Sequence, residues 1–318
     1  MSIPTASHPS SIARRLAFAS LFVALDAPSL LAKAPTMNVD KAIESAIQGK
    51  SIDLATVTPA TDSVAFARNL AQRLVRETAS ERRERIASLV EDMYSPRRPC
   101  QDRETMQALA RGSATLEDRG SNKALDVLLY RCDPKVLASM PDELLGPLRN
   151  RPSLRWLELT TRVKPPGALP VLRTLAKQVP RIPEGSWNEA MAANGDAALE
   201  SAYVDSFLET EDPGTKKDMA EVLRRIGTRK SLAALAQEMR TPLVYRLGRV
   251  FQVPVREHIA EQLCIAFPEL DITHPINREE NYALIEAFCE RTFGTKWKTK
   301  RPKVEFSGPL EHGFRPAR

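Results

Sequence analysis

The sequence predicts an all-α protein, and three observations support this fold class. Past residue 37, apolar residues recur at spacings of three and four, the period of a helix that buries one face. The 318 residues include 24 prolines but only 13 glycines, so helix stops are frequent and flexible hinges are few. Only one long stretch, residues 240–255, reads as β-rich. We therefore expect helices joined by short links, with one small β-hairpin inserted near 243–253.

Residues 1–34 have the layout of a secretory signal peptide. Arg14 and Arg15 precede an apolar run at 16–25, and Ala32 and Ala34 place small residues where a signal peptidase cuts. Asp26 interrupts the segment, and a structural N-terminal helix is the alternative. We expect a periplasmic or secreted protein, with a cytoplasmic protein as the alternative. No apolar run reaches the ~20 residues that span a bilayer, so no transmembrane segment is expected in the mature chain.

Residues 35–146 are expected to form an N-terminal helical region. Apolar residues share one helix face in two stretches, at Val64, Ala67, Leu70, Ala71 and Leu74 and again at Ile86, Leu89, Val90 and Met93. The segment SPRRPC at 95–100 ends this part of the pattern. The region is either a set of degenerate repeats or a separate helical domain.

A helical pair is clearest at residues 212–239. Asp212 can cap the first helix, Pro213 suits its first turn, and Gly227 ends it before a second helix begins. A forward alignment places Ile259, Ala260 and Leu263 on the apolar positions of the first helix, at Met219, Ala220 and Leu223. A backward alignment by 63 residues places four further apolar residues on the pair. Trp156 falls on Met219, Val163 on Ile226, Leu169 on Leu232 and Leu172 on Leu235. These unequal spacings indicate repeated helical pairs with insertions.

This pair resembles a HEAT repeat, a family whose unit is two antiparallel helices opened by an Asp-Pro turn. The matching residues are Asp212, Pro213, Lys216, Lys217, Ala220 and Gly227. The match extends to 252–267 and, with Arg149 and Asn150 in place of Asp and Pro, to 147–178. The resemblance implies an α-solenoid of irregular helical pairs over 147–295, in which each pair packs on its neighbours. An irregular helical bundle is the alternative.

Two stretches interrupt the helices. Residues 180–188, PRIPEGSWN, are expected to form a loop between two packing units. The β-rich stretch at 240–255 carries Gly248 at its expected turn. Aromatic and arginine side chains on an exposed loop are types that anchor interfaces, so we expect partner contacts at Arg240, Tyr245, Arg246, Arg249, Phe251 and Arg256. A hairpin that only fills the groove or caps the next helix is the alternative.

The positive charge of the chain is concentrated at its C-terminal end. Residues 291–318 carry eight Lys or Arg and two Asp or Glu, which accounts for the net charge of +6. The remaining body is neutral, whereas a nucleic-acid-binding protein would need a basic stripe on the folded part. We expect 296–318 to be a basic, disordered tail.

Four cysteines suit an oxidising compartment. Cys264 and Cys289 each lie in an apolar helical stretch and are the first candidates for a disulfide, which leaves Cys100 and Cys132 as the second pair. The alternative is that all four are small buried residues with free thiols.

Motifs of enzymes are absent from the sequence, including phosphate-binding glycine loops, a nucleophile elbow and the His-Glu-x-x-His zinc motif. One acidic cluster, at Asp196, Glu200, Asp205, Glu209, Glu211 and Asp212, is better explained as a solvated helix face than as a cation site. We expect no catalytic residues, no metal and no cofactor. The function predicted is a non-enzymatic scaffold that binds a protein or peptide.

The main alternative is a cytoplasmic nucleic-acid-binding protein of HEAT-like architecture, similar to a DNA glycosylase. In that case the arginines at 240–256 and the basic tail would contact phosphates, and Trp156 or Trp187 would stack on a base. A HEAT-like lyase acting on a tetrapyrrole is a third hypothesis, which no particular residue requires.

Overall fold

The computed structural model describes residues 37–53, 57–58, 62–96, 98–247, 251–272, 279–297 and 300–301. Within these residues the chain forms fifteen α-helices, two short 3₁₀ helices and two small two-stranded sheets, which confirms the all-α class. The expected signal peptide at 1–34 lies outside the described residues, as does the part of the tail after residue 301.

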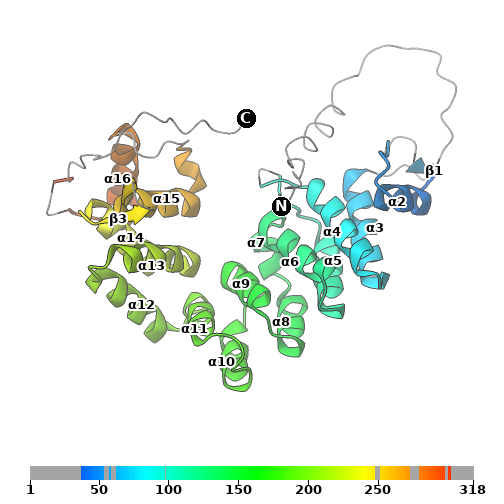
Figure 1. The fold of residues 1–318 in the computed structure, drawn as a ribbon, viewed down its shortest axis with the longest axis horizontal. Coiled ribbons are helices and arrows are strands. Elements are labelled where there is room, and N and C mark those ends of the chain that lie inside the picture. The colour runs from blue at the N-terminus through cyan, green and yellow to red at the C-terminus, as the bar shows by residue number, and fades with distance from the viewer. Residues whose placement is uncertain are drawn as a thin grey trace, which may run out of the picture.

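The helices follow one another with short links. The helices form an arch with two arms (Figure 1). The first arm and the bend of the arch contain α2 (Val39–Ile47), α3 (Ser63–Arg76), α4 (Ser80–Asp92), α5 (Arg103–Thr115), α6 (Arg119–Arg131), α7 (Pro134–Ala138), α8 (Pro141–Asn150), α9 (Leu154–Val163) and α10 (Ala168–Gln178). The second arm contains α11 (Glu184–Ala193), α12 (Ala197–Glu209), α13 (Pro213–Ile226), α14 (Arg229–Gln237), α15 (Val255–Ala266) and α16 (Glu279–Phe293). A short parallel pair, β1 (Met37–Asn38) and β2 (Val57–Thr58), lies beside α2.

The helices stack in two layers that curve into an arch. One layer consists of α4, α6, α9, α11, α13 and α15, each in contact with the next, and lies on the inside of the bend (Figure 1). The outer layer runs through α3, α5, α8 and α10, and then through α12, α14 and α16. This is an α-solenoid, in which each helical pair contacts its neighbours in sequence. The expected boundary at 146/147 falls inside α8, which contacts both α5 and α10.

The two alignments found in the sequence connect helices of the inner layer. The forward alignment takes α13 to α15, and the backward alignment takes α13 past α11 to α9. Inner helices begin at Leu154, Glu184, Pro213 and Val255, so the first two steps are nearly equal and the last is longer. The backward alignment therefore spans two ordinary steps, and the true insertion lies between α13 and α15.

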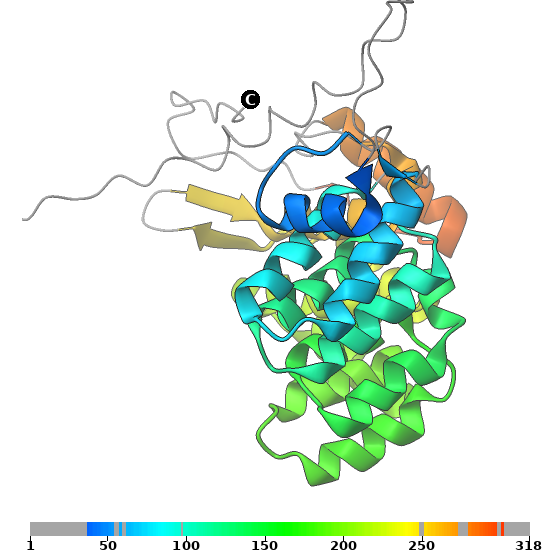
Figure 2. The ribbon, with the colours of Figure 1, turned by 90° about the vertical axis from the view of Figure 1, so that its right-hand side faces the viewer.

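That insertion is the predicted β-hairpin. Strand β3 (Val244–Leu247) pairs antiparallel with β4 (Phe251–Pro254), and Tyr245 lies opposite Val253. Figure 2 shows the hairpin projecting from the side of the stack. The expected turn residue Gly248 lies outside the described residues.

The predicted loop at 180–188 is wrong in its second half, because α11 begins at Glu184. Pro183 is the residue before the first turn of α11. Backbone N–H groups at a helix start have no acceptor within the helix, so proline costs no hydrogen bond there. A proline that looks like a helix stop in the sequence is thus a helix start.

Aspartate residues fix many of the helix starts. Side-chain oxygens of Asp62, Asp102, Asp118, Asp133, Asp196 and Asp212 each accept a hydrogen bond from a backbone N–H in the first turn of the following helix. The predicted cap at Asp212 is confirmed, with Thr215 N at 2.7 Å. At the other end of α13, Gly227 has φ of +59°, a conformation that favours glycine.

The hydrophobic core divides into two clusters. The first extends from Ala42 to Met191, and the second from Ala192 to Cys289. The division coincides with the place where the outer layer has little contact, between α10 and α12. Most of the predicted apolar stripe on α3 is buried, but Val64 is exposed and Phe66 takes its place in the core.

A fully buried arginine joins three helices of the first arm. Arg83 in α4 donates to the carbonyls of Leu74 and Gly112, at the ends of α3 and α5, at 2.7 and 2.6 Å. Its guanidinium also pairs with Asp118 at 2.8 Å and donates to Ser121 Oγ in α6. Because a buried guanidinium needs all of its donors matched, this residue fixes the mutual positions of these helices.

Candidate binding surface

The inner layer presents a row of ion pairs that cross from one helix to the next. Lys123 of α6 pairs with Glu91 of α4, and Asp126 of α6 lies 3.4 Å from Arg155 of α9. Burial raises the pKa of Asp126. Tyr130, also on α6, donates from its hydroxyl to Glu158 of α9 at 2.9 Å. Lys123, Asp126 and Tyr130 are spaced by three and four residues, so these polar side chains share one face of α6.

The row continues into the second arm. Arg225 of α13 makes two hydrogen bonds to Glu189 of α11, at 2.5 and 3.0 Å. His258 of α15 lies 3.3 Å from Glu221 of α13 and 3.6 Å from Glu261. Burial nevertheless lowers the pKa of His258, so its neutral form is favoured. Neighbouring helices of the inner layer are therefore linked by polar contacts along both arms.

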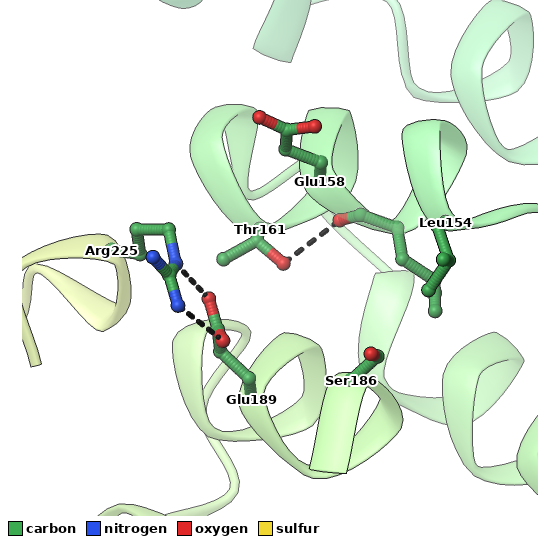
Figure 3. A pocket seen from close by; sticks show the side chains of 7 residues that line it. Leu154, Glu158, Thr161, Ser186, Glu189 and Arg225 are labelled. Atoms are coloured by element: carbon green, nitrogen blue, oxygen red, sulfur yellow. Dashed lines mark hydrogen bonds and ion pairs between the residues drawn. The ribbon is translucent and has the colours of Figure 1, made fainter. Parts of the chain in front are cut away.

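A pocket of about 230 Å³ opens on this layer between α9, α11 and α13. Its lining combines apolar, hydroxyl-bearing and charged side chains, namely Leu154, Leu157, Glu158, Thr161, Ser186, Glu189 and Arg225 (Figure 3). The Thr161 hydroxyl is held by the Leu157 carbonyl at 2.8 Å. Sequence reasoning misses this site, because α11 has only a weak apolar period and half of it reads as a loop.

The residues predicted to contact a partner are divided by the structure between the hairpin and its base. The ring of Tyr245 is half-buried and lies 5.8 Å from Lys217 Nζ of α13. The side chains of Arg246 and Phe251 and the whole of Arg249 lie outside the described part of the chain. Their role as contacts stays a prediction.

Arg256 lies inside the fold instead of on an exposed loop. It belongs to the first turn of α15, is buried, and lies over the ring of Tyr282 at 5.1 Å. The difference arises because α15 begins directly after β4, which brings this position into the contact with α16.

Arg240 is covered by the residues that follow α16. It forms a bidentate pair with Glu286, with both distances 3.0 Å, and lies over the ring of Trp297. Trp297 in turn donates to the Ala236 carbonyl, and Arg301 also pairs with Glu286. The start of the predicted basic tail therefore packs on α14 and α16 and closes this end of the stack.

All four thiols are free, and the members of each predicted pair lie on segments in contact, Cys264 on α15 and Cys289 on α16. Cys100 and Cys132 are joined by a parallel backbone bridge, with Cys100 N at 2.6 Å from the Arg131 carbonyl. A hydrogen bond from the Cys132 thiol lowers the pKa of Cys100. Burial raises the pKa of Cys264 to about 11 and that of Cys289 to about 12.

The acidic cluster at 196–212 does not form a joint site. Asp196 caps α12 and pairs with Arg173, Glu200 accepts from the Thr228 hydroxyl, and Asp212 caps α13. Hydrogen bonding to Arg173 lowers the pKa of Asp196. Among the described residues, no group of three His, Cys, Asp or Glu side chains is placed to hold a metal ion.

The two tryptophans considered for base stacking, Trp156 and Trp187, are buried in the core. Neither is therefore presented to a nucleic acid in this fold.

No family model, curated protein or solved structure matches the chain. Within the described ranges, every helix is too short or too polar to cross a membrane.

Proposed function

We propose that this α-solenoid is a non-enzymatic scaffold that binds a protein or peptide partner along the inside of its arch. The observation that supports the proposal most is the continuous inner layer of six helices on the inside of the bend, which carries ion pairs between neighbouring helices and the pocket lined by α9, α11 and α13. Curved stacks of helical pairs create extended surfaces suited to extended partners. The resemblance to HEAT repeats at 212–239 agrees with this role.

The two exposed leucines at Leu154 and Leu284 allow a matched test. Leu154, 53% exposed, lines the inner pocket, whereas Leu284, 58% exposed, lies on α16 of the outer layer. Substitution at such exposed positions leaves folding stability almost unchanged. Peptides would be selected from a random library against the intact protein, and their affinities measured for the variants Leu154→Asp and Leu284→Asp.

We expect the selected peptides to lose most of their affinity for Leu154→Asp and to bind Leu284→Asp like the parent protein. Binders that depend on Leu284 and ignore Leu154 would contradict the proposal. The hairpin residue Tyr245 provides a second comparison, since Tyr245→Ala tests whether a partner reaches from the arch to the hairpin.

Export of the protein is part of the same proposal and rests on residues 1–34 alone. Expression of the full chain in a bacterium, followed by cell fractionation and intact mass, is the direct test. Loss of the N-terminal segment from a periplasmic product is the expected result. An uncut cytoplasmic product would contradict export and leave the binding proposal standing.

A further inference from the structure

The volume, the charge and the apolar lining of the pocket between α9, α11 and α13 together favour one kind of ligand. Its volume of about 230 Å³ is below the roughly 300–1,000 Å³ of pockets for drug-sized ligands. Room of this size suits one long side chain of a partner and is too small for a whole cofactor. Because this ligand would be a side chain of a bound peptide, the inference rests on the proposed function.

The charges in the lining favour a cation. The lining contains two carboxylates, Glu158 and Glu189, and one guanidinium, Arg225, so it carries a formal charge of −1. Arg225 is already bound by Glu189 through two hydrogen bonds and lies 3.7 Å from a second carboxylate, Glu221. Its positive charge is therefore neutralised before any guest arrives.

Glu158 keeps capacity for another donor. One oxygen accepts the Tyr130 hydroxyl and the other accepts Arg155, both at 2.9 Å, whereas a carboxylate offers about four lone-pair sites. Arg155 also lies 3.4 Å from Asp126, so it too is shared between two carboxylates. Among the described residues, the hydroxyl of Ser186 has no hydrogen-bond partner and lines the same pocket.

The apolar part of the lining can contact the methylene groups of a long cationic side chain. Leu154 exposes 53% of its surface and Leu157 lies behind it in the core. Lysine and arginine cover apolar surface with their methylene groups while the charged head reaches polar groups. From this combination we infer that the pocket is the anchoring subsite of the arch, and that it takes an arginine or lysine side chain of an extended partner peptide.

A cysteine placed in the lining measures the charge preference without any partner. In the variant Ser186→Cys, the rates of modification by cationic 2-aminoethyl methanethiosulfonate and anionic 2-sulfonatoethyl methanethiosulfonate would be compared at position 186 by peptide mass. We expect the cation-to-anion rate ratio to fall at least about fivefold when Glu158→Gln is added, because the loss of this charge slows the cationic reagent and speeds the anionic one. Adding Glu261→Gln, a similarly exposed carboxylate of the inner layer outside the lining, should leave the ratio unchanged.

A ratio that does not respond to Glu158→Gln, or a preference for the anionic reagent, would overturn the inference. The affinities of the selected peptides give the second readout: replacing their Arg or Lys residues by norleucine should weaken binding to the parent protein but not to Glu158→Gln. If peptides depend on Leu154 yet show no basic residue, the subsite inference fails and the proposed function stands. If the pocket prefers cations but no peptide depends on Leu154, the proposed function fails instead.

Discussion

Arg83 shows how one buried charge organises the first arm. Its guanidinium is fully buried and contacts the ends of α3 and α5 and the start of α6. Replacing it by methionine keeps an unbranched apolar stem but leaves Asp118, the Ser121 hydroxyl and three backbone carbonyls without the guanidinium. We expect Arg83→Met to cost about 3–5 kcal/mol of unfolding free energy in urea denaturation. The matched control is Arg111→Met on exposed α5 surface, which should cost no more than about 0.5 kcal/mol.

The thiols of Cys100 and Cys132 offer a prediction about redox state. They lie side by side on a backbone bridge, and hydrogen bonding lowers the pKa of Cys100. The hydrogen bond with Cys100 raises the pKa of Cys132, so this pair has one thiol that ionises readily. Cys264 and Cys289 lie on α15 and α16, which are in contact, but burial raises the pKa of both thiols. With the oxidant diamide, we expect Cys100 and Cys132 to lose two hydrogens and form a disulfide before the other pair does. Peptide mass mapping, with Cys132→Ser as control, would reveal the opposite order if the prediction is wrong.

His258 predicts a pH dependence of stability. Burial lowers its pKa below the ordinary 6.5, whereas Glu221 and Glu261 act in the opposite direction and Lys217 adds to the lowering. The unfolded chain therefore binds a proton at this residue before the folded chain does, and stability falls as the pH drops below about 6.5. Urea denaturation between about pH 7.5 and 5.5 should show a shallower loss for His258→Gln than for the parent. Equal slopes would refute the prediction.

At the scale of elements, glycine decides how closely α4 and α6 can approach. A Cβ at Gly120 would lie 2.3 Å from Arg83 Cβ, whereas a Cβ at Gly185 in α11 would meet no atom within 4 Å. Alanine at a compatible helical position stabilises a protein over glycine by about 0.4–1 kcal/mol. We expect Gly185→Ala to stabilise the protein by up to about 1 kcal/mol and Gly120→Ala to destabilise it by about 1–3 kcal/mol. Thermal unfolding of the two variants gives the comparison, and a stabilising Gly120→Ala would contradict this packing.

The elements that could be predicted from the sequence are those with strong local signals. The cap at Asp212, the end of α13 at Gly227 and the β-hairpin depend on short-range chemistry and are confirmed. The start of α11 at Glu184 is missed, because proline before a helix looks the same as proline in a loop. The pocket could not be predicted, since it requires three helices whose contacts arise only when the layers stack. The position of Arg256 depends in the same way on packing between α15 and α16.

At the scale of the whole molecule, the division of the core predicts unfolding in two stages. The two clusters meet at α11, where the outer layer has little contact between α10 and α12. In a stacked array of helices, stability depends on the interfaces between neighbouring repeats, so distant parts of the chain can unfold separately. We expect calorimetry to resolve two transitions. Arg83→Met should lower only one of them, and Trp297→Ala, which removes a contact at the far end, should lower only the other.

A single transition shifted equally by both variants would show that the arch unfolds as one cooperative unit. Hydrogen exchange gives an independent measure, because backbone amides of α5 and of α14 should then report the same opening free energy.

The contacts of Arg83 also have a consequence for synthesis of the chain. Its partners Gly112, Asp118 and Ser121 lie 29 to 38 residues further along the sequence. While the ribosome is still adding these residues, α3 and α4 can meet, but the guanidinium between them has only the carbonyls of Leu74 and Glu77 to bind. The growing polypeptide therefore cannot complete the contacts of this guanidinium until Ser121 has emerged. A fragment that ends before Gly112 should not fold, and its circular dichroism spectrum would test this.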